Sequence, residues 1–189
     1  MATLPERELR SGLAECIKHE IIRDAEGFAR LETDIAQALS RDMGYLTDLI
    51  AHNVAIKARV VEADPHEKGD RAHLNFGHTF GHAIETVSNF ALAHGECVAL
   101  GMIAAAHLSN RLGMLDDGSV GRIINLINRA GLPTNATQNI DDVMKTMYFD
   151  KKVRSGKIRF VLPDRIGHVV IRDDVPDDLV RWALETLKG

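Results

Sequence analysis

The sequence is poor in aromatic residues and cysteine, and it has no apolar run that could cross a membrane. Aromatic side chains make up 5% of the 189 residues, so the core must be built mainly from Ala, Ile, Leu and Val. The longest apolar stretch, CVALGMIAAAHL, is interrupted by His107 and is shorter than the roughly 20 residues that a membrane helix needs. The two cysteines, Cys16 and Cys97, lie in apolar helical patterns and cannot form a disulfide framework. We therefore expect two free, buried thiols and no membrane partner.

Long runs of one charge are also missing. The chain carries 23 Lys and Arg residues against 27 Asp and Glu residues, and no cationic run is long enough to follow a nucleic-acid backbone. Glu6, Arg7 and Glu8 occupy the place where a signal peptide would have its apolar segment. Hydrophobic residues at 45% and charged residues at 26% are typical of a globular protein. We expect one compact cytoplasmic unit that does not bind nucleic acid.

Apolar residues recur at helical spacing along most of the chain. The first such stretch follows Pro5, a residue that is tolerated in the first turn of a helix, and contains Leu9, Leu13, Ile17 and Ile21. Comparable patterns predict helices over residues 5–24, 32–39, 44–62, 76–88, 95–111, 119–130, 140–148 and 175–187.

Two segments depart from this helical pattern. Residues 63–73 are polar and contain proline and glycine, which is typical of a loop. Residues 157–171, KIRFVLPDRIGHVVI, alternate in the manner of a β-hairpin that turns at Pro163-Asp164 and Gly167. The predicted fold class is therefore mainly α, with one small hairpin.

Four of the nine histidines lie within residues 73–94. Asn75 precedes an apolar-periodic run and is suited to cap a helix there. His78 and His82 are four residues apart, so they would share one face of this helix. Two histidines at this spacing can begin a zinc site, but they can equally be partly buried residues that are satisfied by hydrogen bonds. His94 stands where the next apolar helix begins and favours the metal hypothesis.

Glu15 interrupts an otherwise apolar helix face. Lys18 is three residues further on and therefore its neighbour, so the two could form a surface ion pair. The surrounding Ala14, Ile17 and Ile21 indicate partial burial instead, and a partly buried carboxylate needs a partner, for which a metal ion is one candidate.

Four stretches of the chain resemble successive motifs of the 3-dehydroquinate synthase family: LPERELRSGLAECIKHEII, RAHLNFGHTFGHAIE, HGECVALGM and DKKVRSGKIRFVLP. They follow the family's order and spacing, and together they span essentially the whole chain. The resemblance covers the C-terminal, mainly helical half of that enzyme. It implies that residues 1–189 form a single metal- and substrate-binding domain, and that the N-terminal α/β domain, which binds most of the NAD, is absent from this chain.

The resemblance also assigns roles to individual residues. It implies that Glu15, His78 and His94 hold Zn²⁺, for which Co²⁺ could substitute, and that His82 and Lys18 are catalytic. The residues that it implies for binding the substrate are Lys18, Lys57, Arg71, Asn75, His82 and Lys152, with Lys151 as the alternative to Lys152. Cys97, one turn from His94, is a weaker candidate for a metal ligand.

The family converts 3-deoxy-D-arabino-heptulosonate 7-phosphate, a phosphorylated sugar acid, to 3-dehydroquinate in the shikimate pathway. The resemblance therefore implies a carbon–oxygen lyase that uses NAD, that works as a homodimer, and that is inactive without its N-terminal domain. Three alternatives stay open: another sugar-phosphate cyclase, a more distant iron-dependent alcohol dehydrogenase, and a metal-binding helical domain without turnover. Departures from the family pattern occur at Cys16, His19, Glu20 and Cys97, and none removes an implied ligand.

Overall fold

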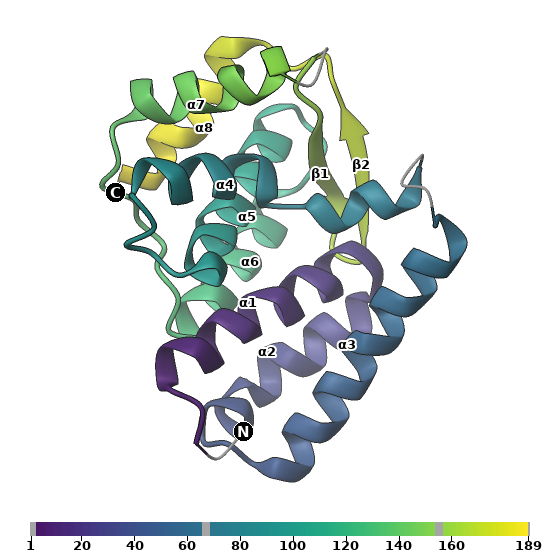
Figure 1. The fold of residues 1–189 in the computed structure, drawn as a ribbon. Helices are drawn as coiled ribbons and strands as arrows, with labels where there is room; N and C mark the ends of the chain where they lie inside the picture. Colours follow the sequence, from purple (N-terminus) through teal and green to yellow (C-terminus); the bar gives the residue numbers. More distant parts are fainter. Residues whose placement is uncertain (1–2, 66–68, 154–156, 189) are drawn as a thin grey trace.

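The structure is a computed structural model that describes residues 3–65, 69–153 and 157–188 and, for 150–153, the backbone alone. Its elements, in chain order, are α1 (Glu6–Arg23), α2 (Ala25–Leu39), α3 (Met43–Ala63), the 3₁₀ helix η1 (Asp70–Asn75), α4 (His78–Val87), α5 (His94–Arg111), α6 (Asp117–Arg129), α7 (Ile140–Val153), β1 (Phe160–Arg165), β2 (His168–Arg172), α8 (Asp177–Glu185) and η2 (Thr186–Lys188). The mainly helical fold class with one hairpin is confirmed (Figure 1).

Helix α5 is the centre of the molecule. It is buried on nearly all sides, and α1, α4, α6, α8 and β1 all pack against it. Ala, Val, Leu, Met and Ile side chains fill its surface, as expected for a helix that does not face solvent. Figure 1 shows α1, α2 and α3 grouped beyond one side of α5, with α7 and α8 beyond the other. None of the helices in the described ranges has the length and apolar character needed to cross a membrane.

Glycines allow α4 to lie directly against α5. A Cβ on Gly101 would be 1.9 Å from the carbonyl oxygen of Gly77, and one on Gly81 would be 2.9 Å from the carbonyl oxygen of Cys97. Gly77 also has a φ of 78°, a left-handed conformation that L side chains rarely adopt, and it forms the N-cap of α4. The contact therefore fixes both where α4 begins and how close its first turn lies to α5.

Helix α1 buries an apolar face and, near its C-terminus, three polar residues. Lys18, His19 and Glu20 are all buried. His19 Nδ1 lies 3.0 Å from Oδ1 of the buried Asn53 on α3, and Asn53 Nδ2 donates to Glu20 Oε1 at 3.2 Å. Asp24 ends α1 and caps α2 by accepting a hydrogen bond from the Gly27 N–H at 2.9 Å. These polar contacts join α1, α2 and α3.

The hairpin docks on the end of α1. Strand β1 pairs antiparallel with β2, and the Gly167 N–H donates to the Ile21 carbonyl at 2.8 Å. The prediction that Pro163-Asp164 forms the turn is wrong, because Pro163 pairs with Val169 and the chain reverses at residues 166–167, where Gly167 has a φ of 91°. The register shifts between Pro163 and Arg165, so Asp164 lies in an irregularity of the strand.

Several predicted helix ends also differ from those observed. Helix α2 begins at Ala25 rather than at residue 32 because Asp24 caps it, and α7 continues to Val153 beyond the predicted end at residue 148. The last predicted helix, residues 175–187, consists of α8 followed by η2. Both cysteines are free, as expected, although only Cys97 is fully buried and Cys16 is partly exposed.

Replacing Gly101 by alanine tests the contact between α4 and α5. The new methyl group would meet the Gly77 carbonyl, so Gly101→Ala should lower the free energy of unfolding by about 1–3 kcal/mol. The matched change is Gly121→Ala on α6, where a new Cβ would have no atom of another element within 4 Å. This change should raise the free energy of unfolding by about 0.5–1 kcal/mol. Urea unfolding followed by circular dichroism measures both changes. Equal effects at the two positions would contradict the close packing of α4 on α5.

Candidate metal centre

The site begins where the chain enters α4. The prediction that Asn75 caps this helix is wrong: Asn75 ends η1, is exposed, and is separated from α4 by the buried Phe76 and by Gly77. His78 is consequently the first residue of α4. Its Nδ1 donates to the Phe76 carbonyl at 3.1 Å, which leaves Nε2 as the nitrogen with a lone pair when the ring is neutral. Such an outer hydrogen bond orients a ring for metal binding.

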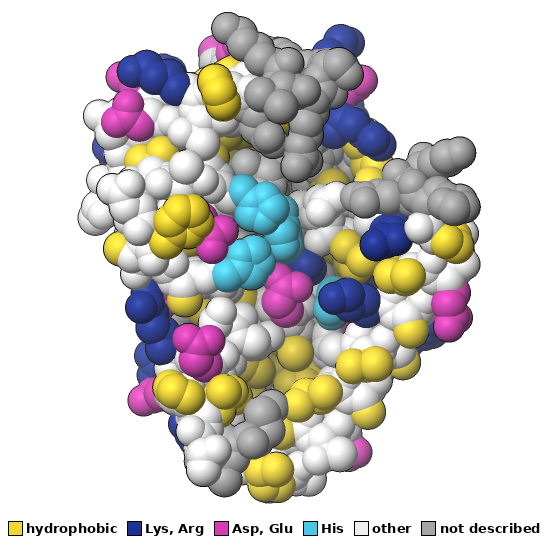
Figure 2. Space-filling model, viewed as in Figure 1, with side chains coloured by type: hydrophobic (Ala, Val, Ile, Leu, Met, Phe, Trp, Pro, Cys, Tyr) yellow, Lys and Arg dark blue, Asp and Glu magenta, His cyan; other side chains and the backbone are white. Residues whose placement is uncertain are grey.

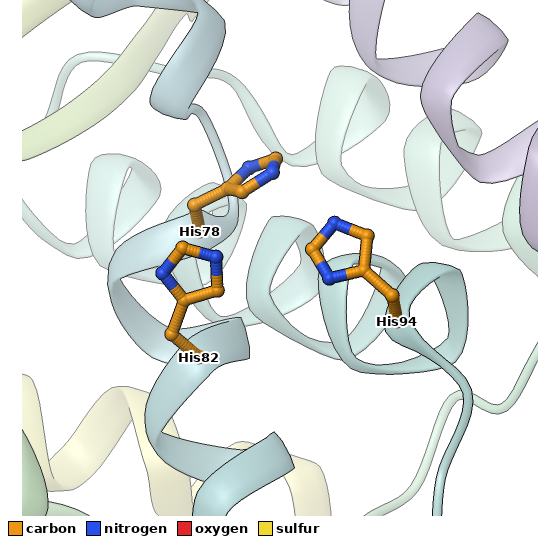
Figure 3. Close-up of side chains that lie close together, drawn as sticks. All are labelled: His78, His82 and His94. Atoms are coloured by element: carbon orange, nitrogen blue, oxygen red, sulfur yellow. The ribbon is translucent and has the colours of Figure 1, made fainter. Parts of the chain in front are cut away.

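Three histidine rings converge on one region. His78 and His82 lie one turn apart on α4, and His94 stands at the start of α5 (Figure 3). The ring centroids are 5.0 Å apart for His78 and His82, 5.2 Å for His78 and His94, and 5.9 Å for His82 and His94. One nitrogen from each ring lies within 4.8 Å of the other two. Figure 2 shows a patch of histidine side chains in the middle of one face of the molecule, with acidic side chains beside it.

Glu15, on α1, completes the cluster. Its Oε1 is 3.8 Å from His78 Nε2 and 3.9 Å from His94 Nε2. This oxygen is buried, and it finds no hydrogen-bond partner within the part of the chain that the structure describes. Tetrahedral zinc with nitrogen and oxygen ligands at about 2.0–2.2 Å has ligand atoms about 3.3 Å apart. Each of the two oxygen–nitrogen distances would therefore have to shorten by about half an ångström for Glu15, His78 and His94 to bind one ion. The buried Glu15 Oε1 would then be one of its ligands.

Lys18 holds the other oxygen of this carboxylate. Its Nζ donates to Glu15 Oε2 at 2.7 Å, and the Lys18 side chain is almost fully buried. Burial by itself would raise the pKa of Glu15, but the charge and hydrogen bond of Lys18 outweigh it, so the pKa of Glu15 is lowered. Burial also lowers the pKa of Lys18, against the opposing pull of Glu15. Glu15 is thus ionised and oriented before any ligand arrives.

His78 is kept neutral. Burial, together with the charge of Lys18, lowers its pKa to about 4. An imidazole must be unprotonated to bind a metal ion, so near pH 7 this ring is ready to act as a ligand. His78 is the most enclosed of the three histidines in the cluster, while His82 and His94 are exposed on its open side.

His94 is held in position by contacts that the sequence did not predict. Ser11 on α1 accepts a hydrogen bond from the Gly95 N–H at 3.0 Å, and Gly95 lies so close to α1 that a Cβ there would be 2.2 Å from the Ser11 carbonyl oxygen. On its other side, His94 Nδ1 is 3.4 Å from Glu85 Oε2 on α4. Glu85 follows His78 by seven residues and His82 by three, a helical spacing that could have indicated its place beside the site.

The cluster offers more donors than one catalytic zinc ion needs. Three protein ligands and an open position are usual for such an ion. Glu15 with His78 and His94 satisfies this requirement, and so do the three histidines together. The first set uses the carboxylate oxygen that has no hydrogen-bond partner among the described residues, whereas the second leaves this charged oxygen next to the ion without binding it. Cys97 is fully buried, and burial raises the pKa of its thiol to about 12. Its role as a weaker candidate ligand stays a prediction.

Comparison with known proteins identifies the family. Residues 12–153 match the family described as 3-dehydroquinate synthase C-terminal. The chain belongs to this family. The resemblance noted in the motifs of the sequence is therefore confirmed.

Curated relatives match the chain over essentially its whole length. It is 44% identical over 191 residues to a 3-dehydroquinate synthase of Symbiobacterium thermophilum, covering 100% of this chain and 53% of the relative. It is 45% identical over 189 residues to one of Acetivibrio thermocellus, covering 99% and 52%. The chain thus spans about half the length of the curated relatives it matches.

Solved structures share the fold. The 2-epi-5-epi-valiolone synthase of Streptomyces hygroscopicus subsp. jinggangensis 5008, with NAD⁺ and Zn²⁺ bound, has a TM-score of 0.90 at 30% identity, covering 98% of this chain and 52% of that one. A 2-deoxy-scyllo-inosose synthase complexed with carbaglucose-6-phosphate, NAD⁺ and Co²⁺ has a TM-score of 0.85 at 24% identity, covering 97% and 53%. The second likeness concerns the fold alone.

The remaining predicted residues of this family member lie in different surroundings. Lys57 is exposed on α3, and its charge adds to the burial that lowers the pKa of Lys18. Arg71 lies on η1, where its guanidinium donates to the Pro65 carbonyl at 2.9 Å. The side chains of Lys151 and Lys152 lie outside the described residues, although α7, which carries them, packs against α4. Their roles in substrate binding stay predictions.

Single substitutions should separate the metal ligands from their neighbour. Glu15→Ala, His78→Ala and His94→Ala should each remove one equivalent of bound zinc, because each takes away one of three ligands. His82→Ala should keep it. Elemental analysis after dialysis against zinc measures the content, with His168→Ala in the hairpin as the control. Loss of the ion from His82→Ala would replace our ligand set by the three histidines.

Proposed function

We propose that this chain is the metal- and substrate-binding half of a 3-dehydroquinate synthase. The proposed reaction converts 3-deoxy-D-arabino-heptulosonate 7-phosphate to 3-dehydroquinate with loss of phosphate, a step of the shikimate pathway. The observation that carries the proposal is the convergence of Glu15, His78 and His94, with the ammonium of Lys18 directly behind the carboxylate. Relatives named for this enzyme match the chain from end to end.

A metal ion fits the donors present. Glu15, His78 and His94 would hold Zn²⁺, or Co²⁺ in its place, and when bound the ion would polarise a substrate hydroxyl or carbonyl oxygen as a Lewis acid. The residues of this chain prepare the place. Lys18 fixes the carboxylate and neutralises it, while the Phe76 carbonyl and Glu85 orient the rings of His78 and His94.

His82 is the proposed proton-transfer residue. It is exposed one turn from His78, on the open side of the cluster, where a substrate would approach. An exposed imidazole can donate a hydrogen bond to a phosphate oxygen and take part in proton transfer there. Lys57, Arg71, Asn75 and Lys152 are the proposed contacts to the carboxylate, hydroxyls and phosphate of the substrate, and Lys18 would add its charge to theirs.

The rest of the enzyme is also part of the proposal. An N-terminal domain would bind the NAD that oxidises and re-reduces the substrate, and the complete protein would act as a cytoplasmic homodimer. The solved relative with NAD⁺ and Zn²⁺ bound supports this pairing of cofactors in the fold. The reaction places the enzyme among the carbon–oxygen lyases.

A second candidate is a cyclase for another sugar phosphate. The likeness to the 2-epi-5-epi-valiolone synthase, at a TM-score of 0.90, favours it, because the same helical half serves that reaction. Recognition of a carboxylate separates the two candidates. Arg71 and Asn75 are the residues that we assign to it, and a substrate that lacks a carboxylate would not need the guanidinium.

Phosphate release by the complete protein tests the proposed function. With zinc and NAD supplied, the heptulosonate phosphate should be turned over, whereas the 189-residue chain alone should release no phosphate above the background of zinc in buffer. His82→Ala in the complete protein should lower turnover by about 10²- to 10⁴-fold with its zinc content unchanged. Turnover only of a sugar phosphate that lacks the carboxylate would favour the second candidate.

A further inference from the structure

A second group of metal-ligand side chains lies outside the candidate centre. Glu20 comes from α1, Asp24 from the junction of α1 and α2, and His52 from α3. One oxygen or nitrogen of each lies within 4.8 Å of the other two. His52 Nε2 is 2.9 Å from Asp24 Oδ2 and 3.5 Å from Glu20 Oε2. Within the described residues, this nitrogen is buried and forms no hydrogen bond of good geometry, although both carboxylates are close enough to interact with it electrostatically.

Glu20 is fully buried, which is unusual for a carboxylate. Its Oε1 accepts a hydrogen bond from Asn53, but across the described parts of the chain its Oε2 has no hydrogen-bond partner. A buried carboxylate with an unsatisfied oxygen is costly unless a cation or a proton compensates it. Burial raises the pKa of Glu20, and the neighbouring His52 opposes part of this rise. The unsatisfied oxygen points toward the same place as His52 Nε2.

The local backbone is shaped around this carboxylate. A Cβ on Gly27 would lie 2.0 Å from Glu20 Oε2, so the carboxylate occupies the space that this glycine leaves in the first turn of α2. Asp24 uses its Oδ1 to accept the Gly27 N–H and thereby directs Oδ2 toward His52. Asn53 fixes Glu20 from the other side, as an outer hydrogen bond does in metal sites. The three donor atoms are therefore held in place by their neighbours.

Arg30 and Arg23 lie near Glu20, Asp24 and His52, but neither arginine is fixed between the three donors. Arg30 Nη2 is 3.5 Å from Asp24 Oδ2, but its side chain is 58% exposed and can move into solvent. Arg23 is directed away, because its guanidinium lies 2.9 Å from His73 Nδ1 and 3.2 Å from Asp70 Oδ2. A cavity of about 310 Å³ lined by Arg23, Asp24, Asp70, Arg59 and apolar residues of α3 opens beside Asp24. Of the three donor residues, Asp24 is the one that borders this cavity.

We propose that Glu20, Asp24 and His52 form a second site for a divalent ion of the zinc class, separate from the candidate catalytic centre. Two carboxylate oxygens and one imidazole nitrogen suit zinc, with water in the remaining position. The ion would compensate the unsatisfied oxygen of Glu20 and join three helices. Its role is structural, because it fixes α1, the helix that carries Glu15 and Lys18.

Zinc binding to a protein without the first centre tests the proposal. The His78→Ala/His94→Ala double variant, dialysed against Zn²⁺ at pH 7.5, should retain one equivalent of zinc, and zinc should raise its midpoint of thermal unfolding. Adding Glu20→Gln or His52→Gln should remove both the equivalent and the shift. Adding His168→Gln should remove neither, although His168 also lies beside a carboxylate, 2.8 Å from Asp164 Oδ1.

Two variants keep the test decisive if one of them folds poorly. Glu20 is buried, so circular dichroism must show that Glu20→Gln is folded, while His52 is a third exposed and its replacement should be tolerated. A double variant that binds no zinc would overturn the proposal, as would zinc retained by both glutamine variants. A midpoint that depends on His52 and on pH, but not on zinc, would also overturn it and would assign His52 as a protonated bridge between the carboxylates.

Discussion

The backbone contact between Gly77 and Gly101 is the constraint on which the site depends. Because neither residue has a side chain, the first turn of α4 lies directly on α5, and His78 and His82 come within reach of His94. A Cβ on Gly101 would lie 1.9 Å from the Gly77 carbonyl oxygen, so a larger residue in this contact would push α4 away from α5 and move His78 and His82 away from His94. The distances between the histidines of the candidate centre are therefore set by main-chain packing in the core.

The charge of the site depends on a different helix. Helix α1 docks on the start of α5 through Ser11 and Gly95, which brings Glu15 beside the histidines. Lys18 then balances the carboxylate from behind and leaves its second oxygen facing the rings. The same helix ends in Glu20 and Asp24, so one element contributes to both groups of donors. A shift of α1 would disturb the two groups together.

Sequence patterns predicted most helices because the core is large and most of the helices around α5 bury one apolar face, which gives a strong helical periodicity. They failed at one helix cap and one turn, where two neighbouring residues were both suited to the position. The N-cap of α4 is Gly77 rather than Asn75, because the contact with α5 requires the left-handed backbone of a glycine. The hairpin turns at Gly167 rather than at Pro163-Asp164, and the Gly167 N–H donates to the Ile21 carbonyl. Glycine conformations of this kind follow from tertiary contacts, which periodicity does not report.

The ligand atoms were harder to predict than the helices. The spacing of His78 and His82 showed a shared face, but Glu15 is 63 residues before His78, and only the resemblance to a family connected them. Glu85, and the group of Glu20, Asp24 and His52, come from helices whose relative placement the sequence does not show.

X-ray absorption at the zinc edge tests the central claim, that one carboxylate and two imidazoles hold the ion. The measurement uses the Glu20→Gln protein loaded with one equivalent of zinc, so that the group of Glu20, Asp24 and His52 contributes no signal. Our account predicts nitrogen and oxygen neighbours at about 2.0–2.1 Å, outer-shell scattering from two imidazoles, and no sulfur at about 2.3 Å. Scattering from three imidazoles, or a sulfur neighbour, would contradict it.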